Sequence, residues 1–152
     1  MKKALKILAA AVSMSLAVLT PASAAPEEET VSNAYLHLDG AMDEWAAAPA
    51  LRLPSSYHGG HLDSWNNSVI YDDALVIIAY ANRKDNADSL ERAKNMGDAF
   101  LQMQAKDPIG DGRVRNSYGP ENLFDADGVP NILSTGTAAG NQAWAGMALA
   151  HL

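Results

Sequence analysis

The stretch that decides the fold is residues 69–81, VIYDDALVIIAYA, in which apolar side chains occupy almost every position. Its main interruption is the pair Asp72 and Asp73 near the start. A helix without a polar face is buried on every side, although the Val and Ile content would also suit a buried strand. The stretch is longer than a usual strand and no turn residue breaks it, so the pattern predicts a buried helix.

The segments that follow alternate in character. Residues 87–105 carry one stripe at helical spacing among charged residues, which predicts an amphipathic helix with one solvent face. The members of this stripe are Leu90, Ala93, Gly97, Phe100, Leu101 and Gln104. Asp88, three residues before Glu91, forms a variant of the capping box at the start of this helix. A third helix, apolar on all sides, is predicted over residues 141–152.

This order of helices indicates the architecture. A helix buried all round, then a helix with one wet face, then a second buried helix is the alternation of a double-ringed helical toroid whose repeat is a helical hairpin. Two buried helices cannot bury each other completely, so the helix after Asn141 lacks neighbours that its composition requires. We therefore predict a mainly α fold, an incomplete (α/α)6 toroid over residues 55–152, in a fragment of a longer protein or a chain that needs partners.

The first residues have the pattern of an export signal. Three lysines within the first six residues form a basic region, and an apolar stretch over residues 7–19 follows it. That stretch is too short to span a bilayer, and ASA at 22–24 supplies the small residues of a cleavage site. We therefore predict a signal peptide over residues 1–24 and a periplasmic or secreted protein. We expect residues 25–54 to form an irregular lead-in.

Composition excludes several classes of function. The chain has 152 residues, no cysteine, and 11 Lys and Arg against 18 Asp and Glu. The lack of cysteine excludes a disulfide scaffold, a cysteine nucleophile and a thiolate metal site. The formal net charge of −7 disfavours nucleic acid and an anionic membrane surface, because both are bound through basic patches. A neutral or cationic ligand suits this charge better.

Three strings, in this order, resemble the first part of bacterial six-hairpin glycosidase-type proteins. They are SWNNSVIYDDALVIIAYANR, DPIGDGRVRNSY and GNQAWAGMALAHL. The resemblance covers residues 51–152 and rests on the pattern of the inner helices together with the loop motif. It implies an (α/α)6 toroid that acts on polysaccharides or oligosaccharides, with carboxylates at the N-terminal ends of inner helices around a central groove.

The adjacent carboxylates Asp72 and Asp73 are the first candidate catalytic group. Glycoside hydrolysis uses two carboxylates, one as an acid and the other as a nucleophile or base. The pair resembles the adjacent aspartates of glycoside hydrolase family 76, but Ala74 and Leu75 follow it where that family usually has Asn and aromatic residues. Successive helical residues project about 100° apart, so only one of the pair need face a groove. The alternative is that both neutralise and cap the helix N-terminus.

The loop over residues 107–118 is the second candidate. Arg113 and Arg115 are suited to sugar hydroxyls or to the carboxylate of a uronate, which they would hold by bidentate hydrogen bonds. Tyr118 would add a substrate contact, and Asp111 is a further catalytic candidate, distant in sequence from the Asp pair. The alternative is a solvated loop stiffened by local salt bridges.

Aromatic and amide side chains at the starts of both inner helices form the third candidate, a substrate-binding group. Aromatic rings stack on sugar rings, and amides hydrogen-bond to sugar hydroxyls. The members are Trp65, Asn66, Asn67, Tyr71, Asn141 and Trp144. The alternative is core packing, which is the favoured interpretation for Trp144.

Metal-binding patterns are weak. His58, His61 and Asp63 are residue types that metals prefer, but two glycines separate the histidines and no third histidine is nearby. Residues 125–128 resemble the start of a calcium loop, but Gly136 stands at the twelfth position, where an EF-hand has Glu. The chain has no phosphate-loop, dinucleotide-binding or serine-nucleophile motif. We therefore expect no metal and no cofactor.

Taken together, these observations predict an exported carbohydrate-active protein. We expect a glycoside hydrolase that acts on a polysaccharide or oligosaccharide, as a fragment of a longer enzyme. The partner would be a carbohydrate, with no nucleic acid and no membrane after signal cleavage, and an oligomer is expected if the chain is naturally this short. Two alternatives stay open. One is a non-catalytic helical binding or interaction module, and the other is an inactive truncated remnant.

Overall fold

The computed structural model describes residues 26–45, 51–62, 64–83 and 86–152. The elements in these ranges are α1 (Pro26–Asp43), a short 3-10 helix η1 (Gly60–Leu62), β1 (Ser68–Val69), α2 (Ile70–Asn82), α3 (Ala87–Lys106), β2 (Ser117–Tyr118), β3 (Ile132–Ser134) and α4 (Ala139–His151). The expected mainly α class is confirmed. The predicted signal peptide lies outside the described residues. None of the described helices is long and apolar enough to cross a membrane.

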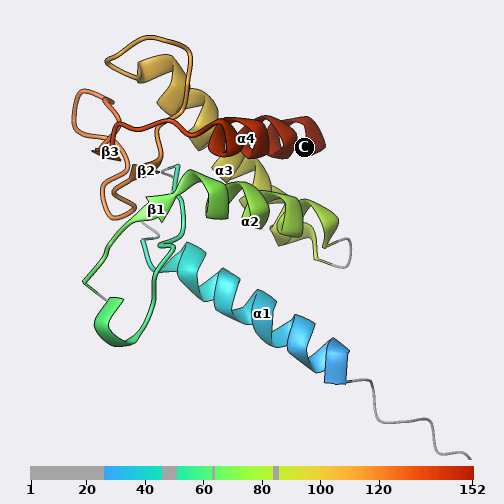
Figure 1. Ribbon diagram of the computed structural model, residues 1–152. Helices are drawn as coiled ribbons and strands as arrows, with labels where there is room; N and C mark the ends of the chain where they lie inside the picture. The colour runs from blue at the N-terminus through green and yellow to red at the C-terminus, as the bar shows by residue number, and fades with distance from the viewer. Residues whose placement is uncertain (1–25, 46–50, 63, 84–85) are drawn as a thin grey trace, which may run out of the picture.

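The helix α2 is at the centre of the packing. It contacts α3, which runs back along it in the opposite direction, and α4, which runs in the same direction as α2 (Figure 1). Its fully buried apolar side chains are Ile70, Ala74, Ile77 and Tyr80. Their spacing of three and four residues produces one buried face on a helix. The helix with the most apolar sequence therefore forms the core against which α3 and α4 pack.

The buried face of α3 differs from the predicted stripe. Leu90 and Leu101 were expected to be buried but are 40% and 51% exposed, and Gln104 is also exposed. The buried side chains of α3 are instead Ser89, Ala93, Met96, Ala99, Phe100 and Met103, together with Gly97. The small residues let α4 approach closely, since a Cβ on Gly97 would stand 2.5 Å from Leu152 Cδ1.

The two strongly apolar helices are not buried on all sides in the described structure, which agrees with the expectation that they cannot bury each other completely. On α2, Tyr71 and Leu75 are exposed, and on α4 Met147 is 55% exposed. The helix α4 buries Ala145 and Ala148 against its neighbours, and begins at Ala139. Both helices are therefore covered over only part of their circumference.

The expected irregular lead-in over residues 25–54 is wrong for Pro26–Asp43, which form α1. This helix packs against the core cluster through Tyr35, Leu38 and Met42. Their spacing of three and four residues is typical of a helix. The signal was weak because polar and small residues stand between them, so no strong apolar face marked the helix in the sequence.

Polar side chains also attach α1 to the hairpin formed by α2 and α3. Asp39 accepts hydrogen bonds from Tyr80 Oη at 3.1 Å and from Arg83 Nη1 at 3.0 Å. Asp43 binds Arg92 through both carboxylate oxygens, at 2.7 and 2.8 Å. Bidentate pairs of this kind fix orientation as well as adding energy. The helix α1 is therefore held at a defined position beside α2.

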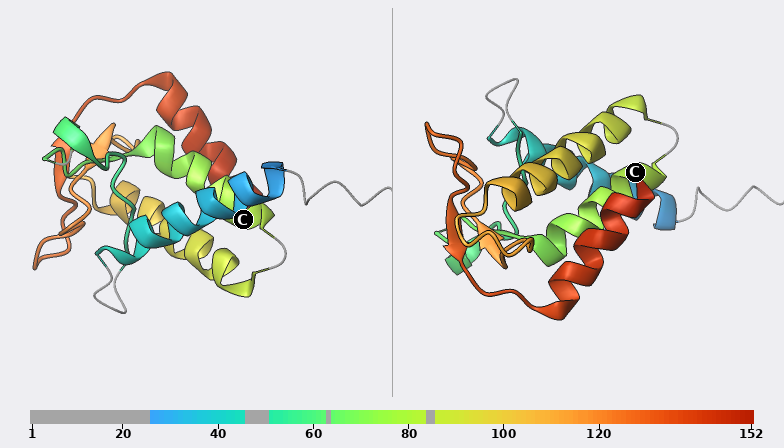
Figure 2. Two further views of the ribbon diagram at one scale, coloured as in Figure 1. Left: turned by 90° about the horizontal axis from the view of Figure 1, so that it is seen from below. Right: turned by 90° about the horizontal axis from the view of Figure 1, so that it is seen from above.

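A small antiparallel sheet, in the order β1-β2-β3, lies at the end of the bundle where α2 and α4 begin (Figure 2). Residue Ser68 of β1 stands opposite Tyr118 of β2. Just before β2, Asn116 connects the two helix starts. Its carbonyl accepts from the Ile70 amide at 3.1 Å, and its Oδ1 accepts from the Ala138 amide at 3.1 Å and from Asn141 Nδ2 at 2.8 Å.

We expect Ile77→Ala to lower the free energy of unfolding by about 2–5 kcal/mol, because it removes a fully buried side chain and leaves a cavity. The matched control, Leu101→Ala, removes an exposed side chain from α3 and should change stability by less than about 0.5 kcal/mol. Urea unfolding followed by circular dichroism measures both. Equal losses for the two variants would contradict the placement of the core.

Candidate functional site

The Asp pair lines a cavity of about 280 Å³ between α1, the segment 54–58 and the first turns of α2. We call it the Asp cavity. Its lining comprises His37, Leu38, Ala41, Pro54, Ser55, Ser56, His58, Asp72, Asp73 and Val76. The two candidate carboxylates are thus at the same cavity, although they project from α2 in different directions. Asp72 is half-buried, and Asp73 is fully buried.

The surroundings of Asp73 leave one of its oxygens without a partner. Ser68 Oγ donates a hydrogen bond of 2.7 Å to Asp73 Oδ2. The other oxygen, Oδ1, is buried and has no hydrogen-bond partner among the described residues. Because Ser68 is held in β1 opposite Tyr118, the sheet fixes the position of the hydroxyl that orients this carboxyl group.

Burial raises the pKa of Asp73 well above its usual value. The hydrogen bond from Ser68 lowers that pKa, and the neighbouring Asp72 raises it further. Removal from water disfavours the charged form of a carboxyl group, and here this effect is the largest. Asp73 therefore keeps its proton to a higher pH than an ordinary aspartate. A carboxyl group in this state can donate a proton to a bound molecule.

The alternative that the Asp pair caps α2 by hydrogen bonding does not match the geometry. The N-cap residue is Val69, and no side chain makes a capping hydrogen bond there. The amide of Val69 instead donates to Ser56 Oγ at 2.9 Å, and that of Ile70 donates to the Asn116 carbonyl. The start of α2 is thus satisfied by groups outside the Asp pair. A favourable interaction of the acidic residues with the helix dipole remains.

Two histidines contribute to the Asp cavity from elements other than α2. The rings of His37 and His58 meet edge to face, with centroids 5.4 Å apart. His58 Nδ1 lies 3.7 Å from Glu44 Oε2. In the sequence, His58 stands out only as a candidate metal ligand. His37 carries no signal there, because α1 was not expected to be a helix. Both residues became visible as part of a site only when α1 was placed beside α2.

The described residues contain no group of three or more His, Asp or Glu side chains that could hold a metal ion. Asp63, which completed the histidine pattern in the sequence, lies outside the described residues. The turn over residues 125–128 is closed by its own groups, since Asp125 Oδ1 accepts from the amides of Asp127 and Val129 at 2.9 and 2.8 Å. These contacts describe a local turn.

A second cavity, of about 290 Å³, adjoins the Asp cavity. We call it the aromatic cavity. It is lined by Glu44, Trp45, Ser55, Tyr57, His58 and Asn66. The Tyr57 ring meets the ring of Trp65 edge to face at 5.7 Å, and Trp65 is 55% exposed. Two of the predicted sugar-contacting residues, Trp65 and Asn66, therefore lie at this cavity or beside it.

The other predicted aromatic and amide residues lie between the starts of α2 and α4. The rings of Tyr71 and Trp144 meet edge to face at 5.9 Å. Trp144 is half-buried and packs against the core cluster, whereas Tyr71 is exposed. Asn141 is bound to Asn116. The carbonyl of Asn67 accepts a hydrogen bond from the Ser56 amide at 2.8 Å.

The loop over residues 107–118 is occupied by its own ion pairs. The buried guanidinium of Arg115 pairs with the buried Asp107 and with Asp111, the latter at 2.7 Å. The amide of Arg115 donates to the buried Tyr118 Oη at 2.8 Å. The exposed Arg113 also pairs with Asp111, and these hydrogen bonds hold the pKa of Asp111 below its usual value.

None of these loop residues lines the Asp cavity or the aromatic cavity. The arrangement agrees with the alternative of a loop stiffened by local salt bridges. The loop differs from a fully solvated one because Arg115 is buried. The structure thus places Asp72 and Asp73 at one cavity with Asn66 at the next, and places Asp111, Arg115 and Tyr118 elsewhere.

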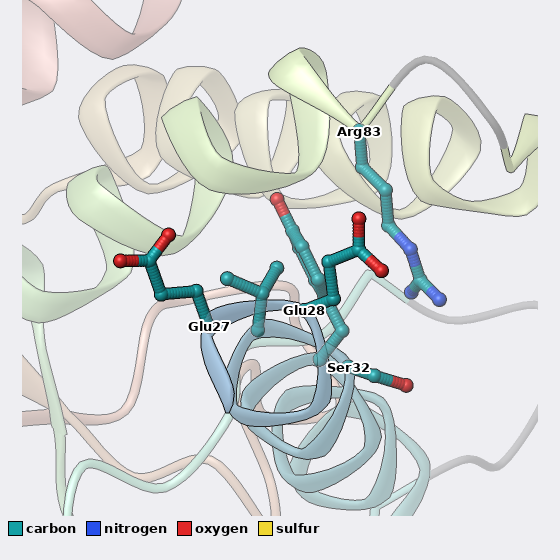
Figure 3. Close-up of a pocket in the computed structure, with 6 residues that line it drawn as sticks. Glu27, Glu28, Ser32 and Arg83 are labelled. Atoms are coloured by element: carbon teal, nitrogen blue, oxygen red, sulfur yellow. The ribbon is translucent and has the colours of Figure 1, made fainter. Parts of the chain in front are cut away.

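A further hollow, of about 330 Å³, lies beside the first half of α1 (Figure 3). Glu27, Glu28 and Ser32 line it from the helix, and Arg83 lines it from the end of α2. The guanidinium of Arg83 already pairs with Asp39 and stacks over the Tyr35 ring, 4.4 Å from its centroid. This hollow therefore offers mainly exposed groups and a cation that already has partners.

No family model, curated protein or solved structure matches this chain.

We expect Asp107→Asn to lower the free energy of unfolding by about 1.5–3 kcal/mol, because it weakens the charged hydrogen bonds to Arg115. The pKa of Asp107 is lowered by Arg115, so this contribution is present above about pH 3.9 and is lost as the pH falls below it. Urea unfolding at pH 7 and pH 3 measures the difference. The exposed Asp127→Asn is the control, and equal effects would contradict a structural role for Asp107.

The raised pKa of Asp73 predicts the opposite dependence on pH. An unfolded aspartate releases its proton near pH 3.9, whereas folded Asp73 keeps it, so stability should fall as the pH rises, by up to about 1.4 kcal/mol per pH unit, until the folded pKa is reached. Asp73→Asn, which keeps a hydrogen-bond acceptor for Ser68, should remove this fall. Urea unfolding from pH 4 to pH 8 tests it, with Asp98→Asn as the exposed control. Parallel curves for the wild type and Asp73→Asn would contradict the raised pKa.

Proposed function

We propose that this chain is part of an exported glycoside hydrolase that acts on a polysaccharide or oligosaccharide, with the Asp cavity as its reaction site. The observation that carries the proposal is Asp73, a buried carboxyl group with a raised pKa, next to Asp72 at a cavity. Hydrolysis of a glycosidic bond requires a carboxylic acid that is still protonated and a second carboxyl group. Two neighbouring carboxyl groups in different environments can fill these two roles, because the environments separate their pKa values.

Each carboxyl group would have its own role in this reaction. Asp73 gives its proton to the glycosidic oxygen as that oxygen leaves the anomeric carbon. Asp72 is the base for the attacking water, or the nucleophile that water later displaces. The hydrogen bond from Ser68 holds Oδ2, and Oδ1 is the carboxyl oxygen that has no partner among the described residues. The two hydroxyls and two histidines of the lining would then contact the sugar.

The arrangement of the helices supports a hairpin repeat of the toroidal kind. α2 and α4 run in the same direction, with their starts at one end, and α3, which precedes α4 in the chain, runs in the opposite direction against α2 (Figure 1). The exposed apolar side chains Leu75 and Met147 lie on α2 and α4. In the proposed (α/α)6 toroid, further hairpins would cover such side chains.

Release of reducing sugar from a panel of mannans, glucans and xylans tests the proposal, with the longest natural form of the protein. We expect Asp73→Asn and Asp72→Asn to lower the rate by about 10²–10⁴-fold, which is the usual contribution of an acid or base. The matched control, Asp98→Asn, removes an exposed carboxylate on α3 and should leave the rate unchanged. The rate should also fall on the alkaline side as Asp73 loses its proton.

Unchanged release by both variants would exclude the Asp pair from catalysis. Heat of binding without cleavage, measured by calorimetry on the same glycans, would instead favour a non-catalytic binding module. The absence of both binding and cleavage would favour an inactive remnant. Melting curves of each variant verify that a lost rate reflects a lost group and not an unfolded chain.

A further inference from the structure

The Asp cavity and the aromatic cavity share part of their walls. Ser55 and His58 belong to the lining of both. The cavities measure about 280 and 290 Å³. Ligand sites usually begin at about 300 Å³, so each cavity alone has room for one small unit such as a single sugar ring. Two such spaces on either side of His58 suit a ligand made of two linked units.

Each cavity is also lined by a residue with a buried side-chain oxygen that makes no hydrogen bond among the described residues. For the Asp cavity this oxygen is Asp73 Oδ1, and for the aromatic cavity it is Asn66 Oδ1. A buried polar atom without a hydrogen bond costs stability. Sugar hydroxyls both donate and accept hydrogen bonds, so they would satisfy the protonated carboxyl group of Asp73 and the amide oxygen of Asn66. The amide nitrogen of Asn66 makes only a long contact of 3.4 Å, to Glu121.

The two cavities differ in the side chains that could hold a sugar ring. Tyr57 and Trp45 line the aromatic cavity, and Trp65 stands next to Tyr57. Tyr and Trp rings combine a large apolar face with a polar atom, which suits the faces and hydroxyls of a sugar. The Asp cavity has the carboxyl pair in place of such rings. One cavity is therefore equipped for the reaction and the other for holding the neighbouring unit.

The charge of the linings restricts the sugar further. An acidic residue other than the protonated Asp73 lines each cavity, Asp72 in one and Glu44 in the other. Neither Lys nor Arg is among the described residues that line them. An acidic lining without a cation repels uronates and sulfated sugars. Arg113 and Arg115, which the sequence suggested as contacts for a uronate, lie in the loop over residues 107–118 and line neither cavity.

From these observations we infer that the two cavities are adjacent subsites for one neutral oligosaccharide of at least two rings. One ring occupies the Asp cavity, the next occupies the aromatic cavity, and His58 lies at the junction. This inference rests on the proposed function in taking the ligand to be a carbohydrate, but it concerns binding, which can be measured without cleavage.

The test is calorimetric titration of the intact protein with manno- and cello-oligosaccharides of one, two and three rings. All variants carry Asp72→Asn to prevent turnover. We expect affinity to rise about tenfold from one ring to two, the equivalent of one added hydrogen bond of about 1.4 kcal/mol. Asn66→Ala and Tyr57→Ala should abolish this gain and leave binding of the single ring unchanged.

Two controls accompany these variants. Tyr57→Phe keeps the ring and should keep the gain, whereas Asn122→Ala removes an exposed amide outside both cavities and should have no effect. Oligogalacturonates of the same lengths, titrated into protein that retains Asp72, test the charge argument and should bind at least tenfold more weakly than the neutral series. Thermal melting of each variant verifies that it is folded.

The outcomes separate the inference from the proposed hydrolase. A gain that persists in both Asn66→Ala and Tyr57→Ala would overturn the second subsite, even if the wild type cleaves glycans. A gain that these variants abolish would support it, even if the wild type cleaves nothing. Absence of binding by the whole neutral series, or tighter binding of the oligogalacturonates, would overturn the inference.

Discussion

The described structure depends on one residue at the junction of its helices. Asn116 accepts from the Ile70 amide at the start of α2, from the Ala138 amide just before α4, and from the side chain of Asn141. Its own amide donates to the Gly136 carbonyl at 2.8 Å. Groups that must be satisfied at two helix starts are therefore satisfied together. This joint fixes the two helices at one end, where the sheet and the Asp pair also lie.

The second constraint on the site is burial. Asp73 lies where the core, the sheet and α1 meet, and its position costs stability because a carboxyl group is removed from water. The hydrogen bond from Ser68 offsets part of that cost. The same removal from water raises the pKa of Asp73, so that the group keeps its proton to a higher pH than an ordinary aspartate. One physical cause therefore both weakens the fold and raises the pKa of this carboxyl group.

Sequence periodicity was sufficient for the strongly apolar α2 and for the existence of α3 and α4. It failed for α1, where Tyr35, Leu38 and Met42 are separated by residues with little helical signal. It also misassigned the buried face of α3, because hydropathy favours Leu101, whereas the narrow space between helices admits Gly97 and small or flexible neighbours. Periodicity ranks residues by affinity for an apolar environment, and packing selects them by shape.

The candidate site was predictable only in part for a related reason. An adjacent Asp pair at a helix start is visible in the sequence, but its cavity is formed by His37 and by the segment 54–58, which are distant along the chain. The arginines of the loop over residues 107–118 carried a chemical signal equal to that of the Asp pair. Only their placement showed that Arg115 is committed to Asp107 and Asp111.

The position of α1 has a consequence for how this protein can diversify. It supplies part of the wall of the Asp cavity through His37, Leu38 and Ala41, while the helices that form most of the core are α2, α3 and α4. The wall of this cavity and most of the core therefore come from different segments. A substitution of His37 on the cavity side of α1 can therefore change the shape of this cavity while the contacts of α2 with α3 and α4 stay in place.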